Sequence, residues 1–522
     1  MEKFFKKTIS IIGIISCAII FFINVFLGAK LDNSEIVKIS SSNLVDIILS
    51  LLMICTILFF SKALCKMFEN KPKIKKIIFL SVIAILYLTV QVVWINIRHA
   101  TPSYDQEFVL TIAEKMYDNK YDEIGEWHVD YLAKCPQQIS LSWFWSKLYR
   151  VFGIRKILNL EYMNAVLNTL TFIGIILISK QLGKKYEINV FKTMLTCISF
   201  ISLAMFSTFV YGDIPSITCC VYAVYFIMKY TETRKIQYAI LSSLLTAIAI
   251  IVRTNSYVFL IAIVIYLLLD LLALEKKSIL KSLLVFVCVI AFSILPSAII
   301  KNSVENKLNI DKERSLPTLA YLYMGMSESY KANGWYNFSI MEMTFDSREE
   351  ANETYKELIN NRFEYFEKNP TIFLKFYLDK IASMWAENTY ATSLYNNSAY
   401  CGVTAEYFGL ENSKEKTEYL NKCVDDAYEP ISIVQKGVIL FVFGMSIRIL
   451  FKFRKNISKE VLLLVLIFMG GFFFHILWEA KSRYILLYIV ILFPLVSINV
   501  PIKNFINKKG AKQDEEQKEN MG

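Results

Sequence analysis

Long apolar segments alternate with short polar loops along most of this chain. A helix needs about 20 mostly apolar residues to cross the hydrocarbon layer of a bilayer, and segments of about that length recur through the 522-residue sequence. Backbone groups in lipid must be hydrogen-bonded within the segment, so we expect helices rather than strands. The sequence therefore predicts an all-α polytopic membrane protein with about 12 transmembrane helices. The predicted spans are 8–28, 44–63, 76–97, 162–179, 193–210, 214–229, 237–252, 255–273, 282–300, 431–448, 460–477 and 484–501.

The basic residues fall on every second loop. The loops and chain ends on one side of the predicted topology carry most of the Lys and Arg side chains. The short loops on the other side carry only Lys30, Lys38, Arg253, Lys481 and Arg483. This asymmetry follows the positive-inside rule, so we expect both termini in the cytoplasm of a multi-pass cell-membrane protein. The net charge of +11 is then a topology signal and indicates no nucleic-acid partner.

Two regions on the predicted outer face are long enough to fold. We divide the chain into two N-terminal helices (1–75), a transmembrane core (76–300) that includes the first outer loop (98–161), an extracytoplasmic loop module (301–430), C-terminal helices (431–502) and a disordered cytoplasmic tail (503–522). Cys401 and Cys423 both fall in the second outer region, where a disulfide and two free thiols both remain open. The Lys-, Ile- and Asn-rich composition is typical of a low-GC Gram-positive bacterium.

Both outer regions contain patterns of surface helices. Ser103 followed by Gln106 is a capping-box pattern and predicts a helix start here, with an apolar face lying on the membrane surface. We expect further outer helices at 139–149, 355–366 and 371–385.

Two carboxylates at the predicted outer ends of spans are the candidate acids of a site. Asp105 lies in the first turn of its predicted helix, where a carboxylate also suits the helix dipole. Asp213, followed by Pro215, lies in the outer turn between the fifth and sixth predicted spans and begins the sixth, which by itself is a structural role. We nevertheless predict Asp105 as a catalytic base and Asp213 as an accessory acid, because other polar groups converge on the same face.

Cations in the predicted outer loops run against the positive-inside rule, so their presence there needs another explanation. Arg253 joins two spans, and a charge at membrane depth costs about 2.5–3.5 kcal/mol on insertion scales. Snorkelling to head groups would explain it, but a planar guanidinium also matches a phosphate. Lys481 and Arg483 lie in the last outer turn beside Glu479, which could pair with either. We predict Arg253 and Arg483 as phosphate contacts.

Carboxylates and cations at the edge of an apolar bundle suit one reaction in particular. An acceptor hydroxyl would attack a sugar whose leaving group is a lipid-anchored phosphate, with a carboxylate taking the proton and arginines neutralising the phosphate.

Short motifs at these residues resemble GT-C glycosyltransferases, such as protein O-mannosyltransferases and lipid A aminoarabinose transferases. Asp105-Gln106-Glu107 and Pro136 resemble the family's first outer loop, Asp213-Ile214-Pro215 its second acidic site, and Ser482-Arg483-Tyr484 its late Arg-Tyr motif. The resemblance covers roughly spans three to twelve, and Gln106 departs from the usual acidic pair. It implies a base at Asp105 and a second acid at Asp213. Taking the motifs together with the charges at the span ends, we predict substrate contacts from Glu107, Arg253, Glu479, Lys481, Arg483 and Tyr484.

The expected function is therefore transfer of a sugar from a polyprenyl-phosphate donor to an envelope glycan, glycolipid or protein on the outer face. A lipid-linked saccharide flippase or transporter is the main alternative, although almost no charge lies in mid-span. A membrane O-acyltransferase and a non-catalytic scaffold are weaker alternatives. No His, Cys or carboxylate spacing predicts a metal cage or another cofactor, and a divalent ion between Asp105 and Asp213 stays open.

Overall fold

The computed structural model describes residues 2–272, 276–397, 402–410 and 413–500. Within these residues the chain is almost entirely helical, and nine helices are long and apolar enough to cross a membrane. The long helices are α1 (Glu2–Phe26), α2 (Leu44–Phe68), α3 (Lys73–Arg98), α7 (Ile157–Leu182), α10 (Asp213–Thr233), α12 (Tyr257–Leu271), α13 (Lys276–Lys307), α20 (Lys414–Phe453) and α21 (Lys459–Leu477). Each coincides with a span predicted from hydropathy.

Two further predicted spans form in modified shape. The segment predicted at 193–210 is bent by 55° between α8 (Val190–Ser199) and the pair α9 (Ile201–Met205) and η2 (Phe206–Thr208). The side-chain amide of Asn168 on α7 donates to the carbonyl of Leu203 at 2.7 Å, and that of Asn164 donates to Phe209 at 3.1 Å. Carbonyls of the segment that follows the bend are thus hydrogen-bonded inside the protein, as an irregular segment at membrane depth requires. The other is the shorter apolar helix α11 (Ile236–Val252).

The last predicted span, 484–501, is wrong as a continuous helix. The chain there forms η5 (Ser482–Ile485), α22 (Leu486–Val490) and η6 (Phe493–Ser497). Its residues are buried in protein, and a Cβ added at Gly471 would lie 2.2 Å from the ring of Tyr488. Such an irregular backbone is tolerated because protein surrounds it instead of lipid. The predicted tail, 503–522, lies outside the described residues, and so does Cys401 of the proposed disulfide.

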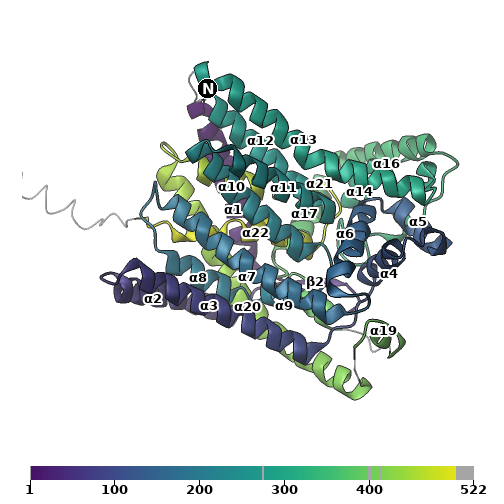
Figure 1. Ribbon diagram of the computed structural model, residues 1–522, viewed down its shortest axis with the longest axis horizontal. Helices are drawn as coiled ribbons and strands as arrows, with labels where there is room; N and C mark the ends of the chain where they lie inside the picture. The colour runs from purple at the N-terminus through teal and green to yellow at the C-terminus, as the bar shows by residue number, and fades with distance from the viewer. Residues whose placement is uncertain (1, 273–275, 398–401, 411–412, 501–522) are drawn as a thin grey trace, which may run out of the picture.

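One end of the bundle, which we call the loop face, carries residues 99–156, 308–397 and 402–410 (Figure 1). Its elements are η1 (Tyr121–Glu123), η4 (Lys312–Arg314), α4 (Asp105–Tyr117), α5 (Glu126–Lys134), α6 (Gln137–Phe152), α14 (Thr318–Gly325), α15 (Phe338–Met341), α16 (Arg348–Lys368), α17 (Pro370–Trp385), α18 (Thr392–Asn396) and α19 (Gly402–Tyr407). The helices predicted at 139–149, 355–366 and 371–385 are confirmed as α6, α16 and α17.

The helix predicted after Ser103 also forms, as α4, but neither the expected capping box nor the expected contact with the membrane surface is present among the described residues. Its N-cap is Tyr104, at φ 53°, and no side chain caps it. The apolar residues of α4 pack against protein: Val109 and Ala113 share a core with Trp145 of α6, and Ile112 packs with Ile139. The predicted capping box and the membrane-facing surface of this helix are therefore wrong.

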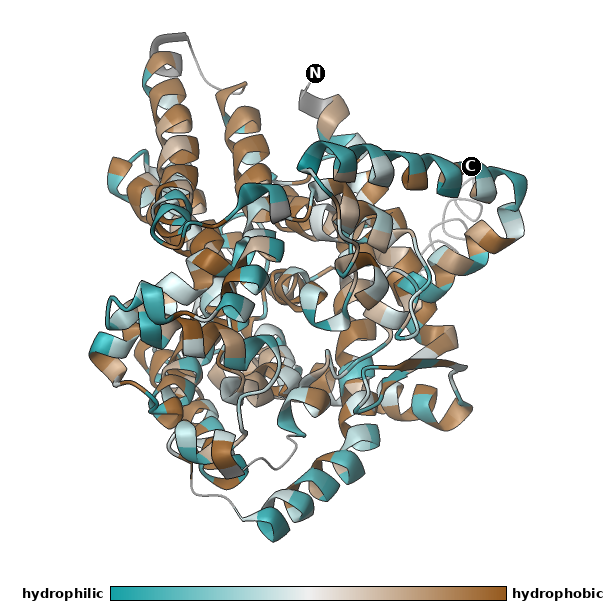
Figure 2. Ribbon diagram, turned by 90° about the vertical axis from the view of Figure 1, so that its right-hand side faces the viewer, coloured by the Kyte–Doolittle hydropathy of each residue, from teal (hydrophilic) through white to brown (hydrophobic). Residues whose placement is uncertain are grey.

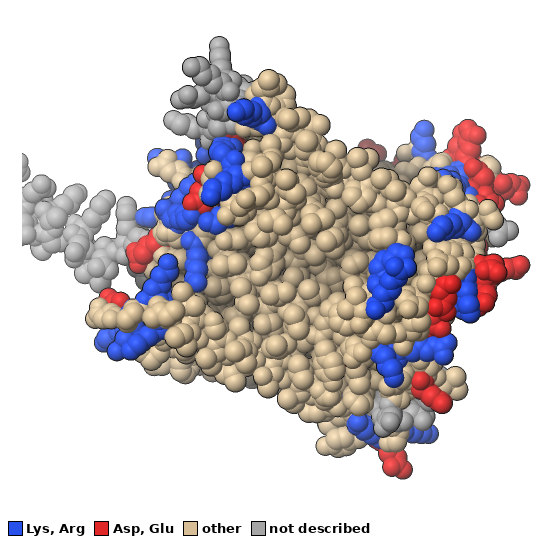
Figure 3. All heavy atoms as spheres, viewed as in Figure 1, with Lys and Arg blue, Asp and Glu red and all other residues tan. Residues whose placement is uncertain are grey.

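A β-hairpin joins α1 to α2 at the loop face. Strands β1 (Leu27–Leu31) and β2 (Val37–Ser41) pair antiparallel, with Leu27 opposite Ser41 and Leu31 opposite Val37. Viewed from the loop face, hydrophilic and hydrophobic residues mix (Figure 2). In the space-filling view, charged side chains gather at the two ends of the molecule and an uncharged belt lies between them (Figure 3). This distribution is the one expected of a bundle embedded in lipid.

Candidate functional site

Three elements meet at a buried carboxylate on the loop face. Asp213 is the first residue of α10, Arg253 follows α11, and Arg483 lies in η5. The Nη1 atom of Arg253 lies 3.0 Å from Oδ2 of Asp213, and Nε of Arg483 lies 3.9 Å from Oδ1. A Cβ added at Gly212 would lie 2.2 Å from the carbonyl oxygen of Val252, so only glycine lets this turn pack against the end of α11. We call Asp213, Arg253 and Arg483 the arginine triad.

Aromatic rings surround Arg483. Its guanidinium carbon lies 5.0 Å from the ring centres of Phe209 and Tyr211, 4.8 Å from Tyr395 and 5.6 Å from Tyr484. Rings within about 6 Å attract a cation through their quadrupole, more strongly where water is excluded. Asp213 only partly compensates the charge of Arg483, because the same carboxylate also pairs with Arg253. The aromatic rings therefore help to stabilise the Arg483 guanidinium.

A second group of three charged residues lies next to the arginine triad. Glu35, at the tip of the β-hairpin, forms ion pairs with both Lys481 and Lys331. Burial raises the pKa of Glu35, but the two lysines together lower it to about 2. The Nζ atom of Lys481 lies 5.4 Å from the ring centre of Tyr395, the same ring that contacts Arg483. We call Lys331, Glu35 and Lys481 the lysine triad.

Asp105 lies beside these two triads on the surface. It is exposed at the start of α4, and the hydroxyl of Tyr131 donates to its Oδ1 at 3.2 Å. Tyr211 connects it to the arginine triad: burial and the charge of Asp105 raise the pKa of Tyr211, whereas Arg483 and Arg253 lower it. The side-chain amide of Gln138 donates to the Tyr211 hydroxyl at 2.6 Å. Asp105 and both arginines therefore act electrostatically on one buried tyrosine.

Glu479 adds a second carboxylate without an ion pair among the described residues. Instead of pairing with Lys481 or Arg483, its Oε1 accepts a hydrogen bond from the hydroxyl of Tyr484 at 3.2 Å. Burial raises its pKa, and the neighbouring charge of Asp105 acts in the same direction. Asp105 and Glu479 therefore lie close enough to interact.

The backbone around Glu479 is fixed from three sides. His475 Nδ1 lies 3.1 Å from the carbonyl oxygen of Glu479, and the amide of Ala480 donates to Gly334 at 2.8 Å. Lys380 of α17 is fully buried and donates to the carbonyls of Gly325, Ile476 and Trp478 at 2.5–2.8 Å. Burial lowers the pKa of Lys380 to about 7. These contacts join the loop face to the end of α21 directly beside Glu479.

Contacts link six of the eight residues predicted from the sequence, namely Asp213, Arg253, Glu479, Lys481, Arg483 and Tyr484. Asp105 is linked to them through its charge, which acts on the pKa of Tyr211 and of Glu479. The eighth, Glu107, is half-buried on α4, and burial raises its pKa. Within the described part of the chain no hydrogen bond or ion pair joins the Glu107 side chain to the triads.

Sequence reasoning predicted Tyr484 but missed Glu35, Lys331, Lys380 and the roles of Tyr211 and Tyr395 beside the cations. Glu35 is separated from Lys481 by 446 positions, and no local pattern links them. The turn residues Asp32, Asn33 and Ser34 do predict a hairpin, but a hairpin pattern does not say where its tip docks.

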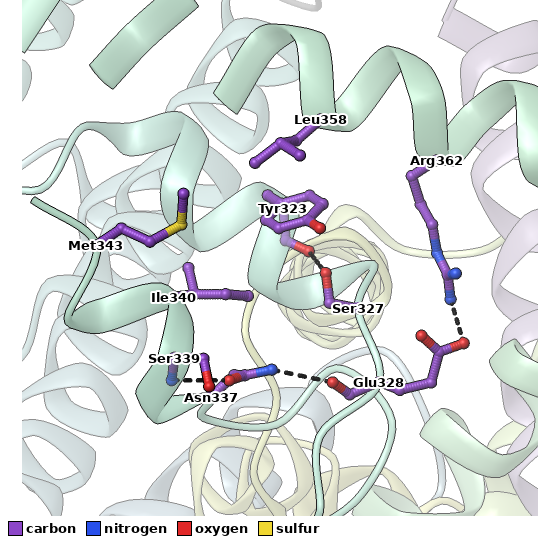
Figure 4. Close-up of a pocket in the computed structure, with 9 residues that line it drawn as sticks. All are labelled: Tyr323, Ser327, Glu328, Asn337, Ser339, Ile340, Met343, Leu358 and Arg362. Carbon is purple, nitrogen blue, oxygen red and sulfur yellow. Dashed lines mark hydrogen bonds and ion pairs between the residues drawn. The ribbon is translucent and has the colours of Figure 1, made fainter. Parts of the chain in front are cut away.

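A cavity of about 350 Å³ opens on the flank of this site (Figure 4). Asn337 lines it together with Tyr323, Leu358 and Arg362. The ring centre of the preceding residue, Tyr336, lies 5.1 Å from Nζ of Lys331 in the lysine triad. Burial raises the pKa of Tyr336, and the charges of Asp105 and Glu479 act in the same direction. One short segment therefore separates the cavity from the charged site.

The described residues contain no group of three or more His, Cys, Asp or Glu side chains placed to hold a metal ion. The two carboxylates considered for a divalent ion have other partners here. Asp213 faces two guanidinium groups, and Asp105 accepts from Tyr131.

The fold and site define a polytopic all-α membrane protein with a charged cluster at one end of its bundle. The chain belongs to the family described as conserved hypothetical integral membrane protein, whose model matches residues 2–503. A comparison with curated proteins found no match.

Proposed function

We propose that this protein is a membrane glycosyltransferase of GT-C type that transfers a sugar from a polyprenyl-phosphate donor. The observation that carries the proposal is the pair of buried arginines, Arg253 and Arg483, held beside the Asp213 carboxylate at 3.0 and 3.9 Å, with the exposed acid Asp105 on the same loop face. Guanidinium groups match phosphate oxygens in geometry and charge. A carboxylate beside them can serve an acceptor hydroxyl. The short motifs that resemble GT-C enzymes include Asp105, Asp213 and Arg483.

In the proposed reaction, an acceptor hydroxyl attacks the anomeric carbon of the donor sugar. The new carbon–oxygen bond forms while the bond to the phosphate oxygen breaks, and the phosphate leaves with the bonding electrons. Asp105 takes the hydroxyl proton on Oδ2, because Tyr131 already donates to Oδ1. Arg253 and Arg483 stabilise the charge that develops on the departing phosphate.

Asp213 acts in this proposal as a positioning residue. Both of its oxygens face guanidinium groups, at 3.0 and 3.9 Å, so it sets the spacing of the two arginines. The acceptor would be an envelope glycan, glycolipid or protein. The lipid chain of the donor would lie along the apolar belt, which places the reacting phosphate at the edge of the membrane.

The proposed orientation puts the loop face outside the cell. The end of the molecule opposite the loop face carries mostly basic side chains with few acids, whereas the loop face carries both signs (Figure 3). That contrast supports cytoplasmic termini by the positive-inside rule.

The test is transfer from synthetic polyprenyl-phosphate sugars by the purified protein, with products followed by mass spectrometry. We expect turnover by the wild type and a loss of about 10²–10⁴-fold in Asp105→Asn, the usual contribution of a general base. Asp118→Asn, on an exposed acid at the other end of α4, is the matched control and should turn over normally. Normal turnover by folded Asp105→Asn would remove the base. Substrate translocation without product would establish the flippase instead.

A further inference from the structure

The hairpin between α1 and α2 presents Glu35 in a fixed conformation. Oδ1 of Asp32 accepts hydrogen bonds from the amides of Ser34 and Ile36, both at 2.9 Å. Glu35 itself has φ 60°, a left-handed conformation that costs energy for a residue with a side chain. The tip is therefore an ordered turn.

The hairpin is bound to segments that line the charged site. The amide of Val37 donates to the carbonyl of Lys331 at 2.9 Å, and that of Ala29 donates to Ala386 at 3.0 Å. At the tip, the side-chain amide of Asn397 donates to Asn33 at 3.1 Å. These bonds place Glu35 between two lysines that lie far apart in the sequence.

The lysine triad has one more positive charge than it compensates. The side chains of Lys331, Glu35 and Lys481 are only 12–14% exposed, so water screens them weakly. The triad holds two ammonium groups and one carboxylate. Burial and the like charge of Arg483 act to lower the pKa of Lys481, but Tyr395 and Glu35 outweigh them, so the pKa is raised and the ammonium stays charged. A surplus of buried positive charge is costly unless an anion offsets it.

Each ammonium group also has donors to spare. An ammonium carries three N–H donors, and Glu35 accepts from both lysines. Tyrosine rings flank the pair: Lys331 lies 5.1 Å from the ring centre of Tyr336, and Lys481 lies 5.4 Å from that of Tyr395. The charges of Asp105 and Glu479 act on the pKa of Tyr336, and the ring centre of Tyr395 lies 4.8 Å from the guanidinium carbon of Arg483. The lysine triad is therefore continuous with the proposed catalytic site.

We propose that the lysine triad is a second anion-binding subsite, in which Glu35 holds Lys331 and Lys481 at a fixed spacing for a phosphate or carboxylate group of a substrate. The identity of the substrates in this proposal depends on the proposed function. The shared chemistry has two possible sources, the second phosphate of a diphosphate donor or an acidic group on the acceptor. In either case the arginine triad takes one anionic group and the lysine triad takes another.

The test is binding, measured by microscale thermophoresis on the purified full chain in detergent. The probes are farnesyl phosphate, farnesyl diphosphate and glucuronate, and the variants are Lys331→Met and Lys331→Arg. Lys30→Met is the matched control, because Lys30 lies on the same hairpin in an exposed ion pair with Glu429. If the subsite takes a second phosphate, Lys331→Met weakens farnesyl diphosphate binding about tenfold, a cost of about 1.4 kcal/mol, and leaves farnesyl phosphate unchanged.

If the subsite takes an acidic acceptor instead, only glucuronate binding weakens in Lys331→Met. In both cases Lys331→Arg retains most of the affinity and Lys30→Met retains all of it. Equal binding of all three probes by wild type and folded Lys331→Met would overturn the subsite. Because no turnover is needed, loss of sugar transfer would leave this result standing, and the two proposals fail separately.

Discussion

Two buried carboxylates, at opposite ends of the bundle, each hold a pair of cations. At the loop face, Asp213 pairs with Arg253 and Arg483, whose side chains are 11% and 5% exposed. At the other end, Asp270 pairs with Arg234 and Lys459, whose side chains are 38% and 22% exposed. Both triads join helix ends that are distant in the sequence.

The difference lies in what surrounds them. The cations around Asp270 reach water, which screens their surplus charge. Aromatic rings surround Arg483 of the arginine triad. Two carboxylates that form no ion pair with any described residue, Asp105 and Glu479, interact electrostatically with its arginines or with Tyr211 beside them. An ion pair at a helix end is therefore a structural device that recurs in this fold. A candidate site needs the further convergence of reactive groups, which only the loop-face triad shows.

The largest effect that separates the two triads should appear in Arg483→Met. Removing a group that stabilises charge in the transition state typically costs about 10²–10³-fold in rate, so we expect that loss in kcat/KM for sugar transfer. Arg234→Met at the other triad should leave kcat/KM within about twofold, since a structural pair makes no contact with the reacting groups. Equal losses of kcat/KM in Arg483→Met and Arg234→Met would show that the arginine triad has no special role in the reaction.

The second-largest difference between the triads should appear in the free energy of unfolding. Asp213→Asn leaves two closely buried guanidinium groups without a carboxylate, and breaking a buried pair in this way costs about 3–5 kcal/mol. Asp270→Asn should cost less, about 1–2 kcal/mol, because water reaches its cations. Chemical denaturation in one detergent compares the two variants. A larger loss for Asp270→Asn would contradict the burial argument.

The smallest effect concerns pH and tests the buried Lys380. Its pKa of about 7 lies below the unfolded value of about 10.4. Between these values the unfolded chain binds more protons, so this lysine makes the protein more stable as the pH rises from 7 toward 10. The melting temperature of wild type relative to Lys380→Met should therefore increase from pH 7 to pH 9.

Lys375→Met, on an exposed residue of the same helix, is the control for Lys380. The difference between wild type and Lys375→Met should be flat across this pH range. A flat difference for Lys380→Met as well would mean that its ammonium is not desolvated.

The apolar spans could be read from the sequence because hydropathy and length suffice for a helix in lipid. The broken segment after Ser482 could not, since an apolar run buried in protein has the same composition as one facing lipid. Asp105, Arg253 and Arg483 were predicted because charges at span ends on the sparsely basic side are unusual. Glu35 and Lys331 were not, because their pairing with Lys481 depends on how a hairpin docks, which is a long-range property.

A double-mutant cycle in kcat/KM between Asp105→Asn and Arg483→Met tests most directly whether the acid and the cations form one site. When two groups act on the same reaction step, substituting both lowers kcat/KM far less than the product of the two separate losses. We predict that the double variant is within about tenfold of the poorer single variant. Losses that multiply fully would show that Asp105 and Arg483 act independently, and would contradict a shared site.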